Sequence, residues 1–241
     1  MDFQKRFLEN TMETLIIFVF LITVLSCGCI DSVKEDSVKE LTDENVTLSP
    51  QDEELAERIG FDKEVLFIVR EDSNVQLHQL TGFDENGTKT KVNGLSIRVP
   101  YEKSEQLVFN LRPKLRPKGY MVFLSEMNFG IGNEPDEIAI LKGTDQYEIL
   151  RIKQTNGINY GVENKDVIDK LKEWEELYPF EILGADFDWV EAEFKTVPED
   201  MDSFAEEVYE FCPDVVDQGT GTVEDLAEEM RKTKRLFLWW D

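Results

Sequence analysis

A run of eleven residues, Leu15 to Leu25, which is apolar except for Thr23, divides this chain into parts of different kind. Lys5 and Arg6 precede the run, and a stretch dominated by charged and small polar residues follows it. The run has the length of the hydrophobic region of a secretory signal peptide and is too short to cross a bilayer comfortably. Charged sequence so soon after it argues against a buried core helix. Residues 1–29 are therefore predicted to be a targeting leader, so that any folded domain begins later.

Two cysteines close this leader. The order Ser-Cys-Gly-Cys at its end resembles a lipobox, in which the signal peptide is cut directly before a cysteine that then receives lipid. Cys27 has Val24 three residues before it, whereas Cys29 has the small Gly28 directly before it, so both cysteines fit. We expect a lipoprotein-type signal peptide with lipid attached at Cys27 or Cys29. The protein would then be anchored in the cell membrane, facing outside the cytoplasm. Acidic residues before the apolar run leave an uncleaved anchor as the alternative.

Residues 30–55 are predicted to be an acidic, flexible tether. The segment repeats Asp-Ser-Val-Lys-Glu and offers little apolar surface to bury. Such a composition stays solvated, so this stretch would hold the domain away from the membrane. Asn-Val-Thr and Asn-Gly-Thr sequons make Asn45 and Asn86 weak candidates for N-glycosylation.

The remaining residues, 56–241, suit a single domain on ordinary size grounds. The whole chain holds 51 acidic and 26 basic residues, which gives a formal net charge of -25. Because nucleic-acid binding rests on phosphate neutralisation by Lys and Arg, this balance excludes DNA and RNA as expected partners. The acidity most simply keeps the protein soluble, and the alternative is that acidic faces hold cations or basic partners.

Cysteine and histidine are too scarce in the domain for metal or disulfide chemistry. Cys212 is its only cysteine and His78 its only histidine, so neither a zinc site nor an internal disulfide is expected. Cys212 is predicted to be a small buried hydrophobe and not a nucleophile, because the only histidine, His78, lies far from it in sequence. We expect no metal and no cofactor.

The periodicity of the domain predicts an α+β fold. Apolar or alternating runs predict strands at 65–69, 75–80, 95–99, 120–124, 138–141 and 236–240. Helical spacing predicts helices at 107–115, 145–156, 164–174, 204–211 and 223–230. The order between Leu95 and Leu124 predicts a β-α-β unit with parallel strands, and Pro113 is expected to stop or kink its helix. Between Glu181 and Lys195 we expect a strand pair or one bent strand with a bulge. The prediction is thus a mixed β-sheet with helices packed on it.

Two further segments contain residue types that could bind an ion. Carboxylates along the bulged strand offer the hard oxygens that calcium prefers, but a solvated strand face explains them better. These carboxylates are Asp186, Asp188, Glu191 and Glu193. Gly219-Thr220-Gly221-Thr222 precedes a helix and would suit an anion, yet simple capping by Thr222 is the better interpretation.

The C-terminal region carries the most specific motif. It reads Phe-Cys-Pro-Asp at 211–214, Gln-Gly at 218–219 and Trp-Trp-Asp at 239–241. In these residues the chain resembles a prokaryotic domain-of-unknown-function family, number 4253, and the resemblance extends more loosely back to about residue 95. It implies a recurring module that usually stands at a C-terminus, and it supplies no activity.

The motif itself supports two interpretations. In the first it defines the fold: Pro213 ends a helix, and Trp239 and Trp240 fill the two sides of a closing strand. In the second it forms a binding site. The candidate residues are Asp214, Asp217, Gln218, Trp240 and Asp241.

These interpretations lead to two functions. The preferred one is a membrane-anchored binding or interaction module whose ligand is an unknown protein or small molecule. The alternative is a carboxylate- or metal-dependent hydrolase that uses the C-terminal carboxylates as acid and base. Convergence of two carboxylates in one concave pocket would favour the hydrolase.

Overall fold

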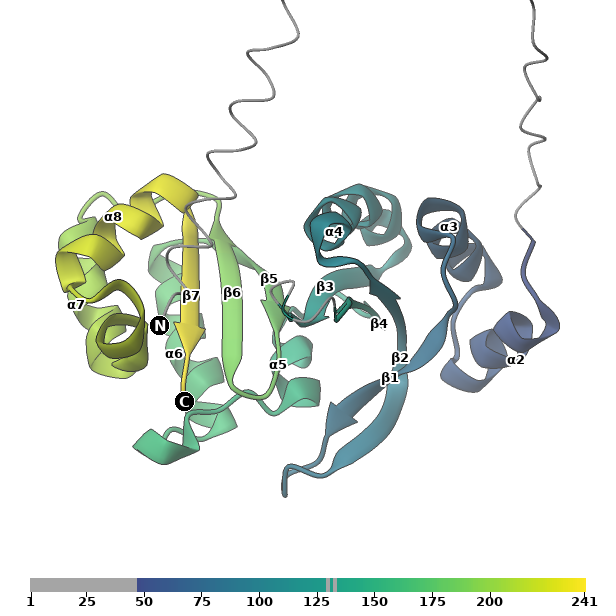
Figure 1. The fold of residues 1–241 in the computed structure, drawn as a ribbon, viewed down its shortest axis with the longest axis horizontal. Coiled ribbons are helices and arrows are strands. Elements are labelled where there is room, and N and C mark those ends of the chain that lie inside the picture. Colours follow the sequence, from purple (N-terminus) through teal and green to yellow (C-terminus); the bar gives the residue numbers. More distant parts are fainter. Residues whose placement is uncertain (1–46, 129–130, 132–133) are drawn as a thin grey trace, which may run out of the picture. The chain divides into compact units, whose positions relative to one another are not determined.

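The computed structural model describes residues 47–128, 131 and 134–241 (Figure 1). All of them fall in one compact unit, Val46–Asp241. The leader, Cys27, Cys29 and Asn45 lie outside the described residues. Within the described part of the chain, no helix is both long and apolar enough to cross a membrane.

A seven-stranded sheet of order β1-β2-β4-β3-β5-β6-β7 runs through this unit. Its strands are β1 (His78–Phe83), β2 (Lys89–Val99), β3 (Tyr120–Glu126), β4 (Asp136–Lys142), β5 (Phe180–Ala185), β6 (Trp189–Phe194) and β7 (Arg235–Trp239). Only β3 and β5 pair in parallel, and the other neighbouring strands are antiparallel. The predicted α+β fold with a mixed sheet is therefore confirmed.

The β-α-β unit is β2, α4 (Tyr101–Leu115) and β3. Both strands run antiparallel to β4, so they are parallel to each other, as predicted. They are not hydrogen-bonded neighbours, because β4 lies between them. Helix α4 continues past Pro113 for two residues to Leu115, and the short 3-10 turn η1 (Arg116–Lys118) follows it.

Helices cover both faces of the sheet and create two apolar cores (Figure 1). One face carries α2 (Pro50–Ile59), α3 (Lys63–Ser73) and α4, and the other carries α5 (Tyr147–Lys153), α6 (Asn164–Leu177), α7 (Met201–Phe211) and α8 (Val223–Thr233). Strand β4 shows how period-two alternation serves both cores. Ile138 and Ile140 enter the first core, while Ala139 and Leu141 enter the second.

The predicted strand at Val65–Val69 is wrong, because these residues belong to helix α3. A short apolar run does not distinguish a buried strand from a buried helix. Here Val65, Leu66 and Val69 lie on one helical face and are all buried. Helix α2 also takes in residues 50–55, which the sequence assigned to the tether: Ser49 caps the helix and Leu55 is buried.

The segment from Glu181 to Lys195 forms the strand pair β5 and β6. Residues 186–188 form the turn between the two strands. The register shifts between Ile182 and Gly184 in β5. Strand β1 begins at His78, later than the predicted residue 75.

Candidate functional site

Asp214 is the centre of the C-terminal motif. It follows α7, and its side chain is almost fully buried. Its Oδ1 accepts hydrogen bonds from the Tyr160 hydroxyl at 2.5 Å and from Gln218 Nε2 at 2.8 Å, and its Oδ2 accepts one from the Asp241 backbone N–H at 2.9 Å. Burial alone would raise the pKa of Asp214, but the bonds from Tyr160, the Asp241 N–H and Gln218 outweigh it and lower the pKa. Asp214 is thus an ionised acceptor that ties three segments together.

The rest of the motif seals the same junction. The Cys212 thiol donates to the Trp239 carbonyl at 3.0 Å, and Asn159 Nδ2 donates to the main-chain oxygen of Asp241 at 2.7 Å. Trp240 is buried and packs edge-on against Phe211, with ring centroids 5.9 Å apart. Gly157 has no side chain because a Cβ there would lie 2.5 Å from the Trp240 ring. We call this group of contacts the C-terminal clamp.

The predicted site residues therefore divide. Asp214, Gln218 and the backbone of Asp241 come together, whereas Asp217 is exposed and accepts a bond from Tyr209. Trp240 is a core residue of the clamp, although its Nε1 is buried and has no hydrogen-bond partner among the described residues. Short 3-10 turn η3 (Ile158–Tyr160) and the π turn η4 (Val215–Thr220) place Tyr160 and Gln218 beside Asp214. The interpretation of the motif as fold-defining accounts for these contacts.

The carboxylates considered for calcium do not converge. Asp186 lies 3.0 Å from Lys153 Nζ, Glu191 lies 3.2 Å from Arg235, and Asp188 is exposed in the turn. Among the described residues, no group of three or more His, Cys, Asp or Glu side chains is placed to hold a metal ion. Thr222 caps α8 by accepting the Asp225 N–H, as the capping interpretation predicts.

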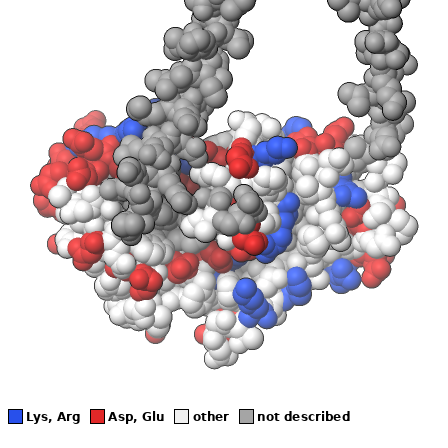
Figure 2. All heavy atoms as spheres, in the orientation of Figure 1, with Lys and Arg blue, Asp and Glu red and all other residues white. Residues whose placement is uncertain are grey.

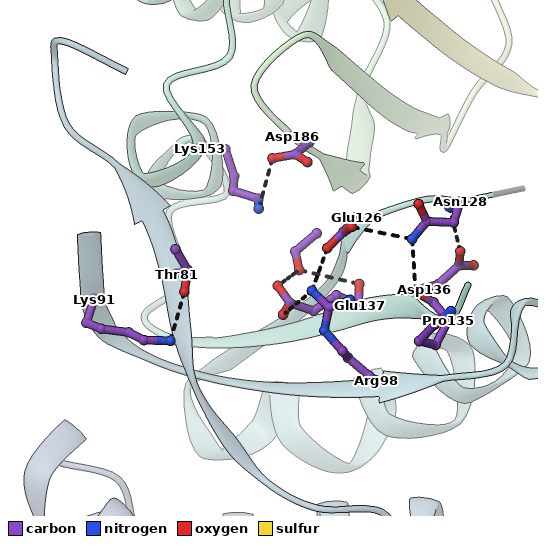
Figure 3. A network of polar contacts seen from close by, with 11 residues as sticks. Thr81, Lys91, Arg98, Glu126, Asn128, Pro135, Asp136, Glu137, Lys153 and Asp186 are labelled. Atoms are coloured by element: carbon purple, nitrogen blue, oxygen red, sulfur yellow. Dashed lines mark hydrogen bonds and ion pairs between the residues drawn. The ribbon is translucent and has the colours of Figure 1, made fainter. Parts of the chain in front are cut away.

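A polar network occupies the sheet edge where β3 ends and β4 begins (Figure 3). Buried Asp136 accepts bonds from the Ser104 hydroxyl at 2.6 Å and the Asn128 backbone N–H at 2.8 Å. Arg98 bonds to Glu126 at 2.8 Å and lies 3.8 Å from Glu137. Each of these carboxylates already has a donor or cation from the chain, so the network fastens the sheet edge.

The Lys153–Asp186 pair stands across from this network (Figure 3). Lys153 is almost fully buried, and its ammonium also lies 5.8 Å from the centroid of the Phe83 ring. Burial raises the pKa of Asp186 above its usual range, although Lys153 opposes the shift. Sequence patterns did not single out Lys153, because it faces Asp186 only after α5 and the β5–β6 turn have packed together.

A cavity of about 480 Å³ opens where the parallel strands β3 and β5 diverge. The two strands share a single register pair, Leu124 with Gly184. Before that point, side chains replace the ladder: Arg112 donates to the Val122 carbonyl at 2.9 Å and to the Ile182 carbonyl at 2.5 Å. We call this space the fork cavity. Its volume is that of a small-molecule site.

Polar side chains from both helical layers line the fork cavity. Gln146 accepts the Ile182 N–H at 2.8 Å and donates to Glu175 at 2.7 Å. The Tyr147 hydroxyl donates to the other Glu175 oxygen at 2.7 Å. The remaining lining residues are Arg112, Arg116, Tyr120, Met121, Val122, Gly143, Thr144, Asp145, Ile149, Glu181 and Lys195. Nothing in the sequence pattern signalled this site, because its residues come from six separate segments.

A second cavity of about 460 Å³ lies between α2 and β1. Its polar groups are engaged in local structure: Asp52 caps α2 with Ser49 and lies 3.5 Å from Arg70. Arg70 in turn donates to the Val75 carbonyl. In the fork cavity, by contrast, Glu175 and Lys195 form no ion pair with any described residue, which makes it the stronger candidate binding site.

Charge is unevenly spread over the face drawn in Figure 2. Red atoms gather over α7 and α8, whereas blue atoms follow the side where β1 and β2 lie. Between Met201 and Met230 there are ten acidic residues and no basic one. They are Asp202, Glu206, Glu207, Glu210, Asp214, Asp217, Glu224, Asp225, Glu228 and Glu229.

The fold and the clamp define a class of α+β module in which a C-terminal strand is locked by a buried aspartate. Residues 137–241 match the family model described as "Domain of unknown function (DUF4253)", so the chain carries a domain of this family there. The matched range starts in β4, later than the looser resemblance from residue 95, and includes the whole clamp. Searches of curated proteins and of solved structures found no match.

Proposed function

We propose that this protein is a membrane-anchored, extracytoplasmic binding module that holds a small ligand in the fork cavity. The observation that carries the proposal is that the hydrogen bonds to Asp214 come from the protein itself. All three of its hydrogen bonds come from the protein's own Tyr160, Gln218 and Asp241, so the motif carboxylate serves the fold. The fork cavity, by contrast, has converging polar groups and a volume suited to a ligand.

Anchoring is supported by the leader. An apolar run of signal-peptide length is followed by Cys27 and Cys29 and then by an acidic tether. One acyl chain gives only weak membrane binding, whereas the diacyl or triacyl groups of lipoproteins hold a protein stably. The domain would thus be held at the membrane while the tether gives it reach.

Metabolic labelling with a lipid precursor tests the anchor. The wild-type chain should be labelled, and the double variant Cys27→Ser, Cys29→Ser should not be. Each single variant identifies the modified cysteine, because only one of the two should lose the label. Equal labelling of the wild type and the double variant would show that the lipoprotein proposal is wrong.

Ligand-observed NMR with a panel of small metabolites tests the binding role against the hydrolytic one. The full-length chain should broaden the signals of at least one compound without creating new signals. New product signals that vanish in an Asp214→Asn variant would instead support hydrolysis by the motif. A panel with neither broadening nor products would overturn the proposed module.

A further inference from the structure

The charges around the fork cavity are balanced in number but not all paired. Three cations and three anions line it: Arg112, Arg116 and Lys195 against Asp145, Glu175 and Glu181. Glu181 lies 3.6 Å from Arg112 and also bonds to Arg116, and Asp145 pairs with Arg151 outside the cavity. Within the described part of the chain, Glu175 and Lys195 form no ion pair within 4.0 Å. The cavity thus offers one free charge of each sign.

Glu175 is held ready for a cation. Gln146 and Tyr147 each donate to a different oxygen of its carboxylate, which fixes the side chain and leaves further lone pairs open. Burial, together with the hydrogen bond to Glu175, raises the pKa of Tyr147, so this phenol remains a neutral donor. Lys172 lies 5.1 Å from the centroid of the Tyr147 ring and makes no ion pair with Glu175. An ammonium group entering the cavity would therefore find a preorganised acceptor.

The positive side of the cavity suits a carboxylate. Lys195 is exposed and follows β6, and Arg116 lies in the turn after α4. Met121, Val122 and Ile182 add apolar side chains to the lining of the same cavity. Apolar side chains bind the body of a ligand, while a few charged groups fix its orientation.

We infer that the fork cavity binds a small zwitterion, a free α-amino acid with an apolar side chain. Its ammonium would contact Glu175, its carboxylate would contact Lys195, and its side chain would lie on the apolar residues of the lining. This inference rests on the proposed binding function and names its ligand class. A molecule with only one of the two charges leaves either Glu175 or Lys195 without its partner.

Isothermal titration calorimetry with L-leucine and its two halves tests the inference. The full-length chain in a non-ionic detergent is titrated with leucine, with 3-methylbutylamine, which lacks the carboxylate, and with 4-methylpentanoate, which lacks the amine. Leucine should bind at least about tenfold more tightly than either half, because a hydrogen bond to a charged group has that effect on Kd.

Matched variants locate the contacts. Glu175→Gln should weaken the binding of leucine about tenfold and leave the affinity for 4-methylpentanoate unchanged. Glu176→Gln, one residue further along α6, should change neither affinity. Lys195→Gln should weaken the binding of leucine and leave the affinity for 3-methylbutylamine unchanged. Lys103→Gln, at an exposed position, is its control. Proper folding of each variant is verified by its melting temperature.

Two results would contradict this inference and leave the proposed binding function intact. One is a half-molecule that binds as tightly as leucine. The other is no binding of leucine while the NMR panel identifies another ligand that Glu175→Gln leaves unaffected. If neither the titration nor the panel finds any ligand, the proposed binding function is overturned as well.

Discussion

Cys212 is buried and lies close to Asp214 in sequence. In the folded protein its thiol is a hydrogen-bond donor, which the neighbouring residues in the sequence do not indicate. Its thiol donates to the Trp239 carbonyl, and burial raises its pKa to about 12. The thiolate is the reactive form of cysteine, so a thiol with this pKa is almost entirely inert at neutral pH. The structure thus confirms a buried cysteine.

Alkylation tests this residue directly. Iodoacetamide at pH 8 should leave Cys212 unmodified in the folded protein and modify it in urea, as read by peptide mass spectrometry. The difference in extent should exceed about tenfold, because both exposure and thiolate fraction rise on unfolding. Rapid modification of the native protein would show that this thiol is accessible and that the clamp is open.

The sequence predicts that the C-terminal motif is buried, but not which residues form hydrogen bonds with it. Pro213 after an amphipathic run predicts the end of a helix, and two adjacent tryptophans predict burial. Tyr160 donates to Asp214 from 54 positions away, and Asn159 reaches Asp241 from 82 positions away. Such pairs depend on tertiary packing, so no local pattern contains them.

At the scale of elements, β7 is held from three sides. It pairs with β6 along its whole length. The residues that follow it belong to the C-terminal clamp: Trp240 is buried in the core, and the Asp241 N–H donates to Asp214. Trp239 pairs in register with Trp189. Loss of the clamp residues would therefore remove the last pairing of β7 with β6 and leave an apolar gap beside Phe211.

Removal of residues 239–241 should unfold the domain or leave it molten. Replacing one buried large aromatic residue with Ala costs about 3–5 kcal/mol, against a total stability of about 5–15 kcal/mol for a typical domain. Asp241→Asn should cost less than about 0.5 kcal/mol, because Asp241 joins the clamp through its backbone and its side chain is exposed. Thermal melts followed by near-ultraviolet circular dichroism compare both variants with wild type. A truncated chain that melts like wild type would refute the structural role of the motif.

Elements also show where periodicity succeeds and fails. Helices α6, α7 and α8 were predicted near their observed bounds, because each carries a clear apolar stripe and a strong cap or stop. The sequence pattern predicts a strand where helix α3 lies, since its apolar run is shorter than two helical turns. The divergence of β3 and β5 was not predicted, because it depends on Arg112 and Gln146 replacing backbone partners.

At the scale of the whole molecule, the clamp joins parts that are distant in sequence. It connects the turn at 157–162, the end of α7 and the end of β7, so one carboxylate links the outer helical layer to the sheet. The surface outside this junction is strongly acidic over α7 and α8 (Figure 2). High net charge of one sign keeps a protein soluble and weakens association with other acidic surfaces.

The pH dependence of stability follows from the same carboxylate. Folding lowers the pKa of Asp214. Its contribution to the free energy of unfolding is therefore complete above the pKa of an unfolded aspartate, about 3.9. The contribution is lost as the pH falls through the lower pKa of the folded state. A neutral asparagine at this position cannot show that loss, so the stability difference between wild type and Asp214→Asn should shrink in acid.

Urea unfolding of Asp214→Asn at pH 7 tests the central claim that the family motif builds the fold. Asparagine places an amide near the Asp241 N–H and removes the charge that three donors share, so the free energy of unfolding should fall by at least about 2 kcal/mol. Asp217→Asn is the matched control, and should change it by less than about 0.5 kcal/mol, because Asp217 is exposed. An Asp214→Asn variant as stable as wild type would contradict the account and return Asp214 to the candidates for catalysis.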